Sequence, residues 1–80
     1  MPYLIQSRRD ELLDGQSPDT PGDLNFLFTT IAKDYVSDKG ESYQIYNDVI
    51  GALECAKLEL YRRQISAYEQ QKIVANGDLE

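Results

Sequence analysis

Two short groups of cationic and aromatic residues carry the only binding chemistry that the sequence suggests. They are Arg8 and Arg9 near the start of the chain, and Lys57, Tyr61, Arg62 and Arg63 further along. Guanidinium groups form forked hydrogen bonds to phosphate, and arginine and tyrosine both stack on nucleotide bases. If the two groups met across a subunit boundary, they would form a pocket for a small phosphate-bearing ligand.

The alternative is that these arginines form ordinary ion pairs with neighbouring carboxylates such as Glu59 and Glu69. Adjacent residues on a helix also diverge by about 100°, which makes it difficult for Arg62 and Arg63 to face one small ligand together. Both interpretations stay open from the sequence.

Catalytic chemistry has little support. The carboxylates of Asp48, Glu54 and Glu59 could do acid–base work, but the last two precede lysine or arginine at spacings typical of surface ion pairs. Cys55 is the only cysteine, and the chain has no histidine to activate it. We therefore expect Cys55 to be a small buried residue at a helix crossing, and we expect no enzyme, no metal site and no cofactor.

Length and charge limit the possible partners. A single domain of 80 residues, spanning 1–80, has a marginal core of its own. With one cysteine and no histidine, a homo-oligomer is the remaining support. The net charge of −6 disfavours DNA, RNA and anionic membranes as partners. The longest apolar run, 49–53, is too short to span a bilayer, and no export signal is visible, so we expect a cytoplasmic protein.

The first twenty residues predict an N-terminal arm, a short helix and a loop. Ser7 precedes Asp10 by three residues, which indicates a helix start, and the following turns would place Leu12 and Leu13 on the core side. Gly15 would end this helix.

Two longer helices follow. Thr20 and Pro21, with Asp23 at the third helical position, predict a helix over 21–39 that ends before Gly40 in a left-handed cap. A long helix is predicted over 43–75, either straight or bent near Ser66 and Ala67, and ending at Asn76-Gly77. Its apolar stripe comprises Tyr46, Val49, Ile50, Leu53, Ala56, Leu60 and Tyr61. Gly51 with Cys55, and Ala52 with Ala56, are small residues four apart that would let another helix approach closely.

These patterns predict an all-α fold with a short N-terminal helix and an antiparallel pair formed by 21–39 and 43–75. A helix of this length is long for so small a domain, so we expect a symmetric oligomer in which the long helices make the contact. Of the tyrosines, Tyr35, Tyr46 and Tyr61 are expected in the core or interface, and Tyr43 and Tyr68 are expected to be more exposed.

The chain also resembles a family of small, mostly uncharacterised phage and bacterial proteins. The resemblance rests on the segments 22–25, 47–59, 61–63, 68–69, 72–73 and 76–78, of which 47–59 is the specific one. Similar proteins often have a proline where this chain has Ala67. In size and architecture the chain is also similar to small helical phage proteins that sequester cyclic nucleotide immune signals.

Two functional hypotheses follow. In the first, the chain is a non-enzymatic phage-type accessory protein that sequesters a small phosphate-bearing ligand, plausibly a cyclic nucleotide second messenger, through Arg8, Arg9, Lys57, Tyr61, Arg62 and Arg63. In the second, it is a structural or adaptor protein that acts through protein–protein contacts without a small ligand.

Overall fold

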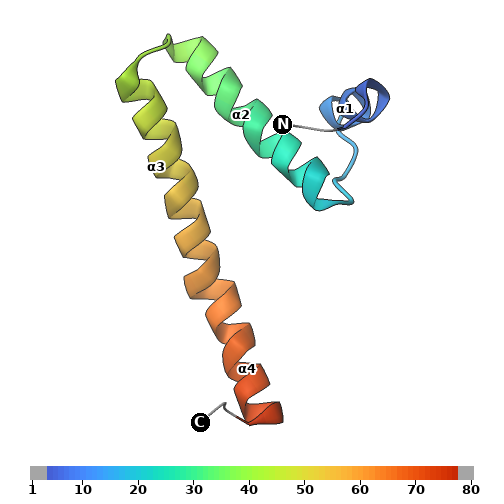
Figure 1. Ribbon diagram of the computed structural model, residues 1–80, viewed down its shortest axis with the longest axis vertical. Helices are drawn as coiled ribbons and strands as arrows, with labels where there is room; N and C mark the ends of the chain where they lie inside the picture. Colours follow the sequence, from blue (N-terminus) through green and yellow to red (C-terminus); the bar gives the residue numbers. More distant parts are fainter. Residues whose placement is uncertain (1–3, 78–80) are drawn as a thin grey trace. The chain divides into compact units, whose positions relative to one another are not determined.

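The computed structural model describes residues 4–77, and within them the protein is all-α. It has a short N-terminal helix, a helix of 19 residues and a long C-terminal helical run of 34 residues (Figure 1). The chain divides into two compact units, one ending at Ile45 and the other beginning at Tyr46. The antiparallel pairing of the two longer helices stays a prediction.

The short N-terminal helix, α1, spans Gln6–Leu13. Its start differs from the prediction, because Ile5 rather than Ser7 occupies the N-cap position and no side chain caps the helix. The backbone carbonyl of Ile5 instead accepts hydrogen bonds from the amides of Arg8 and Arg9. After the helix, Gly15 adopts a positive φ of 99°, a backbone conformation that favours glycine, so the predicted end of the helix is confirmed.

One leucine of α1 forms the core of the first unit. Leu12 is 3% exposed, whereas the adjacent Leu13 is 59% exposed, so the prediction that both face the core is right for Leu12 and wrong for Leu13. Consecutive helical residues diverge by about 100°, and α1 is covered on one side only, where it contacts the next helix.

The second helix, α2, spans Pro21–Lys39, as predicted. The hydroxyl oxygen of Thr20 accepts a hydrogen bond of 3.1 Å from the backbone amide of Asp23, which confirms the predicted cap. Gly40 follows with φ 95° and ψ 132°. Its positive φ agrees with the prediction, but its ψ lies outside the left-handed helical region.

The C-terminal run contains α3 at Tyr43–Leu60, a π-helical turn η1 at Tyr61–Ile65 and α4 at Ser66–Asn76. Its start is capped by Ser42, whose hydroxyl accepts a hydrogen bond of 3.1 Å from the amide of Ile45. The run ends one residue later than predicted, at Asn76, and Gly77 follows with a φ of 85°. Figure 1 shows the three segments as one continuous helical run.

The apolar pattern of α3 continues through the π turn. In the sequence, Ile65 and Tyr68 follow Tyr61 by four and seven residues, which is the spacing of one helix face. The π turn over Tyr61–Ile65 widens the helix at this point. We call the residues of this pattern the apolar stripe; it comprises Tyr46, Val49, Ile50, Leu53, Ala56, Leu60, Tyr61, Ile65 and Tyr68.

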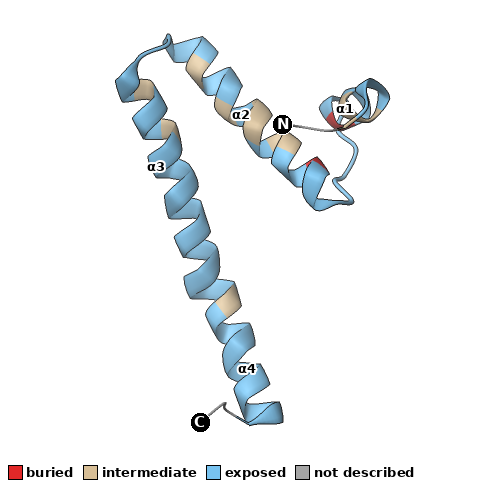
Figure 2. Ribbon diagram, viewed as in Figure 1, coloured by how far each residue is buried: buried red, intermediate tan, exposed pale blue. Residues whose placement is uncertain are grey.

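Very little of the described chain is buried. Leu12 and Asp23 are the two buried residues among 4–77 (Figure 2). Leu53 on the apolar stripe is 43% exposed. Cys55 is also exposed, so its predicted burial is not found within the chain. A Cβ atom built on Gly51 would meet no atom within 4 Å, which leaves the space beside this glycine open.

Replacing Leu12 by alanine should selectively destabilise the first unit, because it empties the one apolar position that is buried within residues 4–45. Truncation of a buried leucine costs about 2–5 kcal/mol. Leu13→Ala is the matched control and should have little effect, since that side chain is exposed. Amide hydrogen exchange of α1 measures both variants; equal protection in the two would contradict this account of the core.

Candidate functional site

Arg8, one of the predicted ligand-binding residues, is engaged within the first unit. Its guanidinium group donates hydrogen bonds to the carboxylate oxygen Oδ2 of Asp23, at 2.7 Å from Nη2 and 3.2 Å from Nε. It also donates to Glu11 at 3.1 Å, to Asp19 at 3.3 Å and to the backbone carbonyl of Ser17 at 3.2 Å. Arg8 therefore joins α1 to the loop and to the first turn of α2.

The pKa values of this pair move in the directions expected for a stabilising ion pair. The hydrogen bonds from the Arg8 guanidinium, helped by the backbone amide of Asp19, lower the pKa of Asp23 from 3.8 to about 2. The same contact with Asp23, followed by that with Glu11, raises the pKa of Arg8 above its ordinary value. Asp23 is 2% exposed, so its charge has Arg8 as its main compensation.

Arg9 is placed differently. Its Nη2 atom donates a hydrogen bond of 2.9 Å to the side-chain oxygen of Gln6, one turn earlier on α1. The adjacent arginines of α1 therefore do not share one partner.

Arg62 and Arg63, by contrast, converge on one carboxylate. Arg62 Nη2 lies 2.9 Å from both oxygens of Glu59, and Arg63 Nε donates to the oxygen Oε1 of the same residue. These hydrogen bonds lower the pKa of Glu59. Although adjacent residues diverge, a carboxylate at position i can reach both i+3 and i+4, and here it does so at the start of the π turn.

The remaining candidates lie on the same helical run. Lys57 pairs with Glu54 at 3.0 Å, and Tyr61 is a half-exposed member of the apolar stripe. The structure thus brings Arg62 and Arg63 together within the second unit, next to Tyr61 in sequence. The group on which the two arginines converge is the carboxylate of Glu59.

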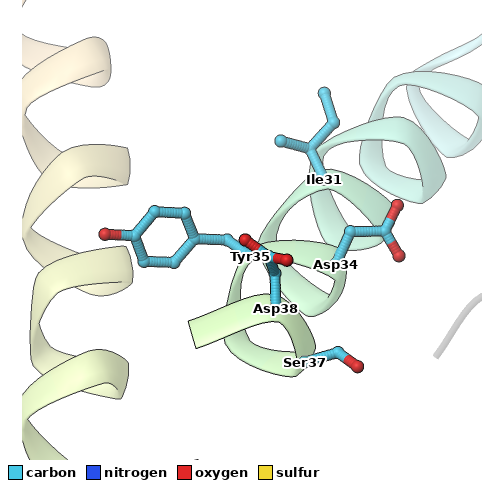
Figure 3. A pocket seen from close by; sticks show the side chains of 5 residues that line it. All are labelled: Ile31, Asp34, Tyr35, Ser37 and Asp38. Carbon is cyan, nitrogen blue, oxygen red and sulfur yellow. The ribbon is translucent and has the colours of Figure 1, made fainter. Parts of the chain in front are cut away.

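A surface hollow on α2 has the wrong geometry for a specific site. Its volume is about 780 Å³, and the residues that line it are Ile31, Asp34, Tyr35, Ser37 and Asp38. Figure 3 shows Tyr35 and Asp34 pointing to opposite sides of the helix, so these side chains do not converge on one point. The Lys39 ammonium lies 5.8 Å from the centre of the Tyr35 ring.

Within residues 4–77, no group of three or more acidic, cysteine or histidine side chains is arranged to hold a metal ion. None of the helices in the same range has the length and apolar character needed to cross a membrane.

Comparison with known proteins places the chain in one family. The profile of a domain of unknown function, DUF6899, matches residues 1–79. The chain belongs to this family. The match extends over both compact units. No curated protein and no solved structure matches the chain.

The structure assigns roles that the sequence analysis did not find. Asp23 was predicted only as part of a helix start, yet it is the buried partner of Arg8, fifteen residues away. Nothing in the local pattern signals a pairing across a loop. The convergence on Glu59 did have a signal, since the sequence places arginines three and four residues after it.

Arg8→Gln should raise the pKa of Asp23 from about 2 towards 3.8, because it removes the main donor to that carboxylate. In the unchanged protein the ion pair stabilises the contact between α1 and α2 above pH 4. This stabilisation is lost as the pH falls from about 4 towards 2, where Asp23 gains a proton. Carbon NMR titration of the Asp23 carboxyl group measures the midpoint directly.

The control for this titration is Arg9→Gln, which changes the adjacent arginine, a donor to Gln6. It should leave the Asp23 midpoint where it is. An unchanged midpoint in Arg8→Gln would show that Arg8 does not set the pKa of Asp23.

Proposed function

We propose that this protein is a non-enzymatic structural or adaptor protein that acts through protein–protein contacts on the apolar stripe of its long helical run. The observation that carries the proposal is the exposure of that stripe. Leu53, Leu60 and Tyr68 are all exposed, although they recur at the spacing of one helix face. Aromatic and aliphatic side chains aligned in this way are typical of a surface that another helix covers.

The charged residues support the same proposal. Arg8, Lys57, Arg62 and Arg63 each pair with carboxylates of their own unit. Cations that are already paired contribute less to binding a new anion, since the existing hydrogen bonds must first be broken. Protein contacts along the apolar stripe do not require these hydrogen bonds to be broken.

Leu53→Asp should abolish retention of any protein partner, because it places a charge in the middle of the stripe. Leu58→Asp is the matched control. It changes the same residue type on the same helix, and five residues of separation leave the two side chains about 140° apart. Native mass spectrometry of protein purified under mild conditions measures which chains are retained.

We expect a complex with the unchanged protein and with Leu58→Asp, and the bare 9.1 kDa chain with Leu53→Asp. Equal loss of the partner in both variants, or a bare chain carrying only a small molecule, would contradict the proposed function.

A second candidate function is sequestration of a small phosphate-bearing ligand, such as a cyclic nucleotide. One observation favours it. Arg62 and Arg63 converge on a single anionic group, and that group is Glu59 of the chain itself. A phosphate could replace this carboxylate between the two guanidinium groups, with Tyr61 available for stacking.

Glu59→Gln tests the second candidate, because it removes the internal competitor and keeps the shape of the side chain. If the arginines bind phosphate, this variant should bind a cyclic di- or trinucleotide several-fold more tightly than the unchanged protein. Glu54→Gln, which alters the separate pair with Lys57, is the control. Calorimetry with a panel of these nucleotides measures the affinity, and the absence of heat with every member would rule the candidate out.

A further inference from the structure

We infer that the partner on the apolar stripe is a second copy of this chain, with its long helical run antiparallel to the first. The inference rests on the proposed function and specifies its partner. Three features of the chain support it: the distribution of charge along the run, the length of the run, and the position of the π turn.

Charge is divided unequally along the run. The first half, residues 46–59, carries three acidic residues, Asp48, Glu54 and Glu59, against one basic residue, Lys57. The second half, residues 60–77, reverses this, with Arg62, Arg63 and Lys72 against Glu69. Two antiparallel copies place each acidic half beside a basic half, whereas parallel copies place like beside like.

The second helix, α2, is too short to cover the whole stripe. The run of 34 residues is about 50 Å long, whereas the 19 residues of α2 reach about 28 Å. Only residues 40–42 separate α2 from the start of α3. Even a complete pairing of α2 along α3 would therefore leave Ile65 and Tyr68 beyond the end of α2. An antiparallel second copy has the length to cover the whole stripe.

The π turn lies where the symmetry axis of such a pair would fall. The whole helical run, from Tyr43 to Asn76, is centred near Leu60, at the junction of α3 and η1. Because Ile65 and Tyr68 continue the helical spacing of Leu60 and Tyr61, a partner that lies along the run can contact apolar side chains on both sides of the turn. An axis through this point gives an isologous interface, in which both copies use the same surface.

Spin labels on the run distinguish the orientations. In a Cys55→Ser background, single labels are placed at Asn47→Cys or Gln71→Cys, both beside the stripe rather than on it. For an antiparallel pair centred near Leu60, two labels at position 71 lie about 30 Å apart, from the rise of 1.5 Å per residue. In a mixture of the two labelled chains, a label at position 47 on one copy lies beside a label at position 71 on the other. This pair adds a distance below about 20 Å. Dipolar electron spin resonance measures these distances.

A parallel pair gives the opposite pattern, with about 10–15 Å between like labels, and overturns the inference while leaving the proposed function intact. A chain that sediments as a monomer but retains a different protein also overturns the inference and leaves the proposed function intact. A monomer that retains no protein contradicts both the inference and the proposed function.

Charge reversal provides an independent measurement. Arg62→Glu with Arg63→Glu makes the whole run acidic, and we expect it to weaken the dimer at least tenfold in sedimentation equilibrium. Lys33→Glu with Lys39→Glu makes the same change of net charge on α2 and should have a smaller effect. Equal weakening by the two double variants would show that net charge, rather than pairing along the run, governs association, and would overturn the inference.

Discussion

The shortage of buried apolar surface is the constraint on which the rest of this structure depends. A helix gains little stability in water from its own hydrogen bonds, and most helical stability in proteins comes from packing an apolar face. Within residues 4–77, Leu12 alone is a buried apolar side chain. Local devices therefore matter more than usual: the caps at Thr20 and Ser42, and the ion pairs along the helices.

The Arg8–Asp23 pair shows how the first unit compensates for its small core. A helix of eight residues is too short to persist alone, and Leu12 supplies a single apolar anchor. The guanidinium group of Arg8 adds contacts to the loop and to the first turn of α2. Arg8, which the sequence suggested as a ligand contact, holds two helices together in this structure.

Local signals in the sequence were sufficient to predict the helices but not their contacts. The residues around Thr20 and Pro21 define the start of α2, because a cap and a fixed φ angle act within one turn. The pattern at Ser7 failed, since the chain entering α1 is extended at Ile5 and the helix begins two residues too early for that serine to cap it. The Arg8–Asp23 pair depends on the path of the intervening loop, which no local pattern contains.

The π turn was not predicted. The sequence was compatible with a straight helix or a bend near Ser66, and the structure instead has a wider turn over Tyr61–Ile65. The apolar pattern contains no signal for this turn, because Ile65 and Tyr68 follow Tyr61 at ordinary helical spacing.

The same turn connects the two candidate functions of the run. It places Tyr61 on the stripe while Arg62 and Arg63 follow it and hold Glu59. If antiparallel copies meet at this turn, the arginines of one copy lie beside Glu59 of the other as well as their own. The carboxylate could then be shared between copies, and its charge would stabilise the interface. Because an isologous contact of this kind closes on itself, it covers both stripes without leaving an apolar end exposed for further copies.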